Sequence, residues 1–131
     1  METLIAALHQ LYNPSQRLRQ SSTAIKFDVE HLYTRAGIAS YISQDMLRTA
    51  IPLAGYDART SLVNGLPYVD YYVKPRFPMT WLWNNVTTRP RGAKRAEWLA
   101  YEMAVRWANE RRASPTAPPT AEPVTAEGSP P

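Results

Sequence analysis

One stretch decides the fold more clearly than any other: residues 93–112, which read AKRAEWLAYEMAVRWANERR. At about 100° per residue, apolar side chains cover most of the circumference of this predicted helix and leave one narrow polar strip. The large apolar residues are Trp98, Leu99, Tyr101, Met103, Val105 and Trp107, and the polar strip is Arg95, Glu102 and Arg106. A helix that is apolar on most sides has to be covered on most sides. The stretch therefore indicates either a central core helix or burial by a second subunit.

Three more helices are predicted N-terminal to this one. The first covers residues 4–12 and stops at the Asn-Pro pair that follows. The second begins at Ser15 as its cap and runs toward Arg35, where Gly37 supplies a helix end. The third covers residues 38–51 and is ended by Pro52. The expected fold class is therefore mainly α, a small helical domain with an N-terminal helix-turn-helix-like arm.

The middle of the chain is rich in prolines and glycines. Between residues 52 and 90 they leave room for a short helix near residues 57–63, an extended segment at residues 68–74 and one or two turns at residues 79–84. An irregular stretch of this length in a small domain is usually functional or packed against a neighbour.

Charge divides the chain into a basic body and an acidic tail. All fifteen Lys and Arg residues lie at or before Arg112, whereas residues 113–131 hold six of the twelve prolines, two glutamates and no cation. Residues 1–112 are expected to form a single helical domain, with a basic helical arm at 1–36 and a helical body at 37–112, followed by an extended proline-rich tail. The body carries nine acidic residues, so its formal charge is +6. Such a surface attracts an anionic partner.

The basic residues form two runs that lack interspersed carboxylates. The candidate nucleic-acid-binding residues are Gln16, Arg17, Arg19, Gln20 and Lys26 in the first run and Arg89, Arg91, Lys94 and Arg95 in the second. Clustered cations accompanied by amide and hydroxyl donors are what phosphate binding requires. The alternative interpretation is a solvated helix face and a basic loop.

Aromatic residues gather in the second half of the chain. Those between residues 68 and 83, with Lys74 and Arg76 among them, would suit either a stacking platform for unpaired bases or packing and subunit contact, and we favour the latter. The predicted subunit-interface residues are Trp81, Trp83, Trp98, Tyr101, Met103 and Trp107.

Enzyme chemistry finds no support in the sequence. The chain has no cysteine, and its two histidines, His9 and His31, each fall within a predicted helix beside apolar residues. Metalloprotease, phosphate-loop and serine-hydrolase motifs do not occur. We expect no catalytic residue, no metal site and no cofactor. No stretch approaches the roughly 18 apolar residues of a membrane span, and Glu2 argues against a signal peptide, so a soluble protein is expected.

The segment Tyr12 to Gln20, read within residues 1–51, carries a family resemblance. A short N-terminal helix, an Asn-Pro turn and a basic polar helix make the chain resemble the α-helical coat proteins of rod-shaped and filamentous archaeal DNA viruses. In that family an N-terminal helical arm wraps double-stranded DNA and the remaining helices form the filament wall. The resemblance implies that Gln16, Arg17, Arg19, Gln20 and Lys26 line the DNA and that the Trp98–Trp107 helix is buried between subunits.

Three functions are consistent with these features. The leading hypothesis is a structural nucleoprotein of the virion, a capsid-type subunit that binds the backbone of nucleic acid, preferably double-stranded DNA, and self-assembles into a helical filament. A related second subunit would fit that hypothesis. The second is a small accessory or regulatory DNA- or RNA-binding protein, with helix-turn-helix reading, and the third is a basic protein-interaction module; either would be cytoplasmic.

Overall fold

The computed structural model describes residues 1–38 and 41–113, and within those ranges the chain is a mixed α/β fold. Its elements are α1 (Glu2–Leu11), β1 (Tyr12–Pro14), β2 (Gln20–Ser21), α2 (Ser22–Ala36), α3 (Gln44–Leu53), β3 (Ala58–Val63), β4 (Leu66–Tyr71), β5 (Val73–Pro75), α4 (Met79–Trp83) and α5 (Arg95–Ala113). The expected mainly α, all-α protein is therefore wrong. The proline-rich tail lies, from residue 114 on, outside the described residues.

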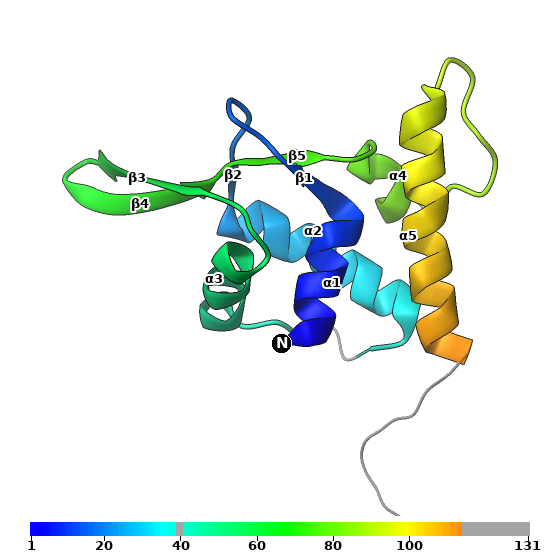
Figure 1. The fold of residues 1–131 in the computed structure, drawn as a ribbon, viewed down its shortest axis with the longest axis horizontal. Coiled ribbons are helices and arrows are strands. Elements are labelled where there is room, and N and C mark those ends of the chain that lie inside the picture. The colour runs from blue at the N-terminus through cyan, green and yellow to red at the C-terminus, as the bar shows by residue number, and fades with distance from the viewer. Residues whose placement is uncertain (39–40, 114–131) are drawn as a thin grey trace, which may run out of the picture.

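The strands form two small antiparallel sheets (Figure 1). One has three strands in the order β2-β4-β3, and the other pairs β1 with β5. In the first sheet, Gln20 of β2 lies opposite Tyr71 of β4. Because β2 precedes α2 and β4 follows α3, this sheet ties together the chain on either side of the α2–α3 helix pair.

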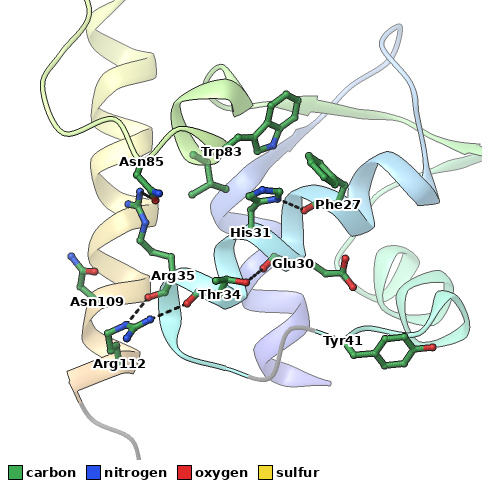
Figure 2. Close-up of a pocket in the computed structure, with 11 residues that line it drawn as sticks. Phe27, Glu30, His31, Thr34, Arg35, Tyr41, Trp83, Asn85, Asn109 and Arg112 are labelled. Carbon is green, nitrogen blue, oxygen red and sulfur yellow. Dashed lines mark hydrogen bonds between the residues drawn. The ribbon is translucent and has the colours of Figure 1, made fainter.

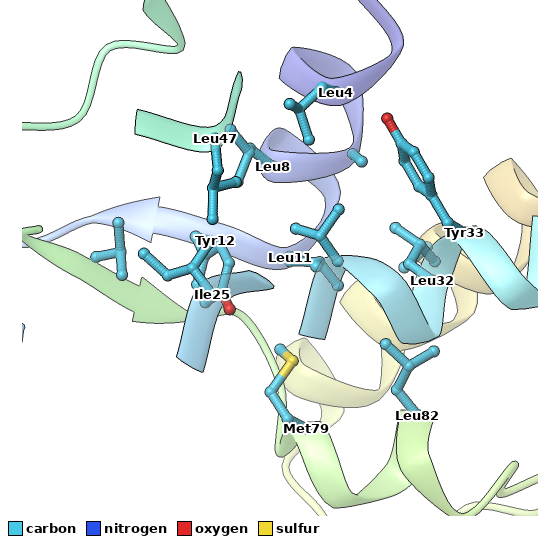
Figure 3. Packing of buried hydrophobic residues seen from close by; sticks show 14 of the residues in the cluster. Leu4, Leu8, Leu11, Tyr12, Ile25, Leu32, Tyr33, Leu47, Met79 and Leu82 are labelled. Atoms are coloured by element: carbon cyan, nitrogen blue, oxygen red, sulfur yellow. The ribbon is translucent and has the colours of Figure 1, made fainter. Parts of the chain in front are cut away.

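The core is built around α1, which contacts α2, α3 and α5. Leu4, Leu8 and Leu11 follow helical spacing and are each at most 1% exposed. They pack with Ile25 and Leu32 of α2 (Figure 3). Burying one such side chain stabilises the fold by about 1.5–3 kcal/mol. The predicted first helix is confirmed, except that Tyr12 already belongs to β1.

The second helix begins later than predicted, because two serines compete for the role of cap. The hydroxyl of Ser15 accepts hydrogen bonds from the backbone amides of Arg17 and Leu18, at 3.2 and 2.9 Å, and closes a local turn. Ser21 instead accepts from the amide of Ala24 at 3.1 Å and caps α2. A serine oxygen serves a turn as readily as a helix start. Residues 15–19 are therefore a loop, and the predicted helical arm is not continuous.

The short helix predicted near residues 57–63 is replaced by strand β3, which covers residues 58–63. The reason is the turn that follows, where Asn64 and Gly65 both adopt positive φ, 53° and 77°. Two consecutive residues in this conformation make the hairpin turn that matches the twist of the flanking strands. An Asn-Gly pair between two runs rich in β-formers thus fixes the β3–β4 hairpin.

The third helix is also shifted along the chain. Ser43 caps α3 by accepting from the amide of Met46 at 3.1 Å, so the helix starts six residues after the predicted start. Pro52 lies inside the last turn and Leu53 ends the helix, which corrects the predicted stop. Pro52 has no backbone N–H, so the carbonyl of Arg48, four residues earlier, lacks its usual helical donor in this last turn.

The predicted last helix is confirmed as α5, but it is not covered on most sides. Its buried row consists of the small residues Ala100, Ala104 and Ala108, and the helix packs closely on α2. Met103, by contrast, is 48% exposed. Tyr101 is buried, and its hydroxyl donates to the carbonyl of Val86 at 2.6 Å. Within the described chain, α5 has one covered side.

One acidic side chain is buried in the core. The carboxylate of Asp28 on α2 accepts from the Tyr12 hydroxyl at 2.5 Å and from Nε1 of Trp83 at 3.0 Å. Burial raises the pKa of Asp28, and the two hydrogen bonds oppose that shift. Because its partners come from β1 and α4, this one carboxylate connects three elements far apart in the sequence.

Candidate nucleic-acid interface

The α2–α3 pair presents one exposed helix. The end of α2 is closed by Gly37 in the left-handed conformation, at φ 72°. Leu47, Ala50 and Ile51 bury one side of α3 against α1 and α2. Its other side is exposed and carries Asp45, Met46, Arg48, Thr49, Pro52 and Leu53. The N-terminal half of α3 is therefore available to a partner.

The β3–β4 hairpin extends away from the body of the chain, near α3 (Figure 1). Both of its strands are exposed along most of their length. The tip is apolar: Leu62, Val63 and Leu66 are 73%, 52% and 69% exposed. At the base of the hairpin, burial raises the pKa of Tyr71, and the positive charge of Arg48 on α3 opposes that rise.

The first predicted basic run is divided among three settings. Gln16, Arg17 and Arg19 are exposed in the β1–β2 loop, whereas Gln20 is half-buried in β2. Lys26 on α2 forms an ion pair with Glu30, with Nζ and Oε2 3.0 Å apart, so its charge is offset. The residues do not line one helix face, as the sequence pattern had predicted.

The second run lies on the α4–α5 loop and at the start of α5. Arg89, Arg91, Lys94 and Arg95 are all exposed, and Nη2 of Arg89 donates to the carbonyl of Ala93 at 2.7 Å. The β1–β2 and α4–α5 loops both lie along the upper edge of Figure 1, away from α3. In residues 1–38 and 41–113, no cation of either loop has a carboxylate oxygen within 4.0 Å. We call these two loops the basic edge.

The predicted interface residues fall into two groups. Trp81, Trp98 and Tyr101 pack on one another within the chain, with ring centroids 5.2–5.7 Å apart. Trp83, Met103 and Trp107 keep accessible surface, and the guanidinium of Arg111 lies 4.6 Å from the centre of the Trp107 ring. Subunit contact through the second group stays a prediction.

Sequence reasoning missed α3 and the hairpin as candidate site elements. The exposed residues of α3 and of the hairpin are not clustered cations, so the charge pattern of the sequence does not point to these two elements. The Asn64-Gly65 pair between residues 58–63 and 66–71 was the available signal, since it marks a hairpin even without knowledge of the fold.

In the described part of the chain, no helix is long and apolar enough to cross a membrane, and no three His, Asp or Glu side chains come together as metal ligands. No protein-family model, curated protein or solved structure matches this chain. Function is therefore inferred from the geometry of the chain itself.

Proposed function

We propose that this protein binds duplex nucleic acid, DNA in particular, as a small accessory or regulatory protein that uses α3 and the β3–β4 hairpin. The observation that carries the proposal is the topology. A helix pair is followed by a hairpin, and a strand that precedes the pair completes the sheet in the order β2-β4-β3. This is the arrangement of a winged helix-turn-helix, in which the second helix of the pair enters the major groove.

The role of α3 follows from its exposed residues. In helix-turn-helix proteins the N-terminal residues of the second helix reach base edges. Arg48 and Thr49 lie in the middle of α3, and both are exposed. An arginine can donate two hydrogen bonds to guanine O6 and N7. The Thr49 hydroxyl donates to the carbonyl of Asp45 at 2.9 Å, so toward a base edge it can act as an acceptor. The link from α2 to α3, residues 37–43, is longer than the three or four residues that usually join the two helices of this motif. The start of α3 is capped by Ser43 within this link.

The hairpin would contribute apolar contacts more than charge. Its tip carries Leu62, Val63 and Leu66, while Arg59 lies farther down β3. Minor-groove proteins insert apolar side chains between base steps and kink the duplex. The foot of the hairpin lies near α3 and its exposed apolar tip extends away from the body (Figure 1), which suits that contact in the groove next to the one that α3 enters.

The basic edge supports a second contact, with phosphates only. Its exposed cations are Arg17, Arg19, Arg89, Arg91, Lys94 and Arg95. Phosphate contacts of this kind add salt-dependent affinity without sequence preference. The coat-type filament subunit stays a prediction, for which the basic edge is the relevant surface. A reading helix with few cations favours the regulatory alternative, because sequence reading needs a few groups at base edges.

The test is binding to a library of random duplexes at 100 mM salt, followed by sequencing of the bound fraction and fluorescence anisotropy on an enriched duplex. We expect an enriched site of a few base pairs that Arg48→Ala abolishes, with a loss of about 1–3 kcal/mol. Arg106→Ala, which removes an exposed cation from α5, is the matched control and should leave the preference intact.

The Arg17→Ala and Arg19→Ala double variant separates the two surfaces. If these residues bind phosphates, the slope of log affinity against log salt becomes shallower by about 0.9 for each phosphate that the variant no longer neutralises. Sequence preference that survives Arg48→Ala would remove α3 from the proposal. Absence of duplex binding at about 100 µM protein and low salt would reject the function itself, since even nonspecific binders associate in that range.

A further inference from the structure

A depression of about 730 Å³ lies between α2, α4 and α5, away from the β3–β4 hairpin (Figure 2). Its volume is within the range of small-molecule sites, about 300–1,000 Å³. The described residues around it have two different chemical characters, aromatic at one end and cationic at the other. No part of the proposed function uses this depression.

The aromatic end consists of Phe27, His31 and Trp83. Phe27 and Trp83 are 48% and 40% exposed, although both carry large apolar rings. The Phe27 ring lies 4.4 Å from that of His31 and 5.2 Å from that of Trp83, centroid to centroid. Each ring thus supports its neighbour and still offers surface to a ligand. An aromatic ligand ring would gain both burial and offset or edge-to-face contacts there.

Hydrogen bonds hold this end in place. Nδ1 of His31 lies 3.0 Å from the carbonyl of Phe27. A carbonyl only accepts, so this hydrogen bond requires a proton on Nδ1. The indole of Trp83 is oriented by its bond to the buried Asp28. The rings are therefore oriented before any ligand arrives, which lowers the entropic cost of binding.

The cationic end consists of Arg35 and Arg112. Nη2 of Arg35 donates to Oδ1 of Asn85 at 2.7 Å, while Nε and Nη2 of Arg112 donate to the carbonyls of Arg35 and Thr34, both at 3.0 Å. Each guanidinium has five N–H groups, so each keeps donors for a ligand.

The charge at this end is not neutralised inside the described chain. Glu30 also borders the depression, but its carboxylate is paired with Lys26. No other ion pair occurs within residues 1–38 and 41–113, so neither arginine has a carboxylate partner there. Two guanidinium groups with free donors beside neutral side chains favour an anionic group, with carboxylate and phosphate as the matching shapes.

The distance between the two ends sets the size of the ligand. Phe27 and Arg35 are eight residues apart on α2, roughly 12 Å along the axis at 1.5 Å per residue. We propose that the depression binds a small aromatic anion, a planar ring joined through a short linker to a carboxylate or phosphate. The ring lies against Phe27 and Trp83, and the anion is held by Arg35 and Arg112.

Isothermal titration of the full chain, without duplex, tests this with four probes. Adenosine 5′-monophosphate and indole-3-acetate carry both a ring and an anion, whereas adenosine lacks the anion and inorganic phosphate lacks the ring. We expect at least one of the first two to bind at least tenfold more tightly than both of the others. Binding by the monophosphate alone identifies a phosphate site, and binding by indole-3-acetate alone identifies a carboxylate site.

Two variants with matched controls locate the binding. Phe27→Ala and Arg35→Gln should each lower the affinity at least fivefold, whereas Leu53→Ala on α3 and Arg106→Gln on α5, which change exposed residues outside the depression, should not. Circular dichroism confirms that each variant is folded. Failure of both ring-bearing anions to bind at 1 mM, or binding that neither Phe27→Ala nor Arg35→Gln weakens, would overturn the proposal. Because no duplex is present, these outcomes do not depend on the proposed function.

Discussion

Two of the antiparallel strand pairs in the described chain, β1–β5 and β3–β4, have opposite surroundings. In the β1–β5 pair, Tyr12 and Val73 are 2% and 1% exposed, and the hydroxyl of Tyr56 donates to the carbonyl of Tyr12 at 2.7 Å. In the β3–β4 hairpin, every strand residue except Tyr71 is at least partly accessible, and the largest exposed apolar side chains are at the tip. Asn13, Pro14 and Lys74 of the first pair are exposed, so one face of that ladder is part of the core, whereas the hairpin projects from the surface.

The difference shows which residues carry stability and which are available for binding. A buried strand pair gains free energy from every apolar side chain that it removes from water. A hairpin exposed on both sides gains little in this way, and an isolated two-stranded hairpin is at best marginally stable. The β3–β4 hairpin is supported at its foot by β2, which pairs with β4, and this leaves its tip for a partner.

The largest expected effect on stability is at the buried carboxylate of Asp28, which holds β1 to α2 and α4. Asp28→Ala removes the acceptor of the buried Tyr12 hydroxyl and of the part-buried Trp83 indole. An unsatisfied buried donor costs about 1–3 kcal/mol, so the free energy of unfolding should fall by about 2–4 kcal/mol. Chemical denaturation followed by circular dichroism measures the loss.

Asp28→Asn is the control for that experiment. The asparagine oxygen can still accept from Trp83, whereas its amide can only donate to the Tyr12 hydroxyl and leaves the proton of that hydroxyl without this acceptor, so we expect a smaller loss than for Asp28→Ala. Asp45→Ala, on the exposed side of α3, should change stability by less than about 0.5 kcal/mol. If Asp28→Ala were as mild as Asp45→Ala, the carboxylate would not be what connects β1, α2 and α4.

A contrast between local and long-range contacts explains which elements could be predicted from the sequence. The first and last helices were predictable, because their apolar spacing is local and the fold buries the residues that the spacing selects, such as Leu8 and Tyr101. Strands β1 and β2 have three and two residues, and they pair with residues about 60 and about 50 positions away, as Asn13 does with Lys74 and Gln20 with Tyr71. No local pattern encodes such pairs.

The candidate site was predicted only in part. The cations of the basic edge are exposed as expected, because their charge alone keeps them in water. Ser21, and not Ser15, caps α2 because β2 pairs with β4 directly before the helix. The sequence around Ser15 carries no information about that long-range pairing. The exposure of α3 followed from the same long-range packing, so its residues were not recognised as a surface.

On the exposed side, we expect a large effect on binding and almost none on stability. The double variant Leu62→Ser, Leu66→Ser removes two leucine side chains from the tip of the hairpin, which are 73% and 69% exposed. Duplex affinity should fall about tenfold, or 1.4 kcal/mol, because the variant no longer places apolar side chains against base steps. The free energy of unfolding should change by no more than about 0.5 kcal/mol. Fluorescence anisotropy and chemical denaturation on one sample measure both, and a stability loss above about 2 kcal/mol would show that the tip is part of the core.

A smaller effect is expected at the turn that supports the tip. Gly65 has φ 77° and open space around it, so Gly65→Ala meets no steric clash with neighbouring atoms. The cost comes from placing a side chain in the left-handed conformation, about 1–2 kcal/mol, and the hairpin absorbs part of it by fraying. We expect a loss of about 1 kcal/mol in stability. Hydrogen exchange should show faster exchange of β3 and β4 amides, with β1 and β5 unchanged; equal acceleration in both pairs would contradict their independence.

The smallest expected effect is a pH dependence confined to the buried side. Burial raises the pKa of Asp28 above the value of about 3.9 that it has in the unfolded chain, against the opposing hydrogen bonds from Tyr12 and Trp83. The folded state therefore binds this proton more tightly than the unfolded state does. The resulting stabilisation is fully present below pH of about 3.9 and is lost as the pH rises through the raised pKa.

Denaturation of the natural chain and of Asp28→Asn between pH 3.5 and 7 isolates the contribution of Asp28, because the variant has no proton to lose at this position. We expect the stability of the natural chain relative to Asp28→Asn to decline with rising pH and then to level off. A relative stability that rises with pH would contradict this. It would mean that the two hydrogen bonds stabilise the ionised carboxylate of Asp28 by more than burial destabilises it.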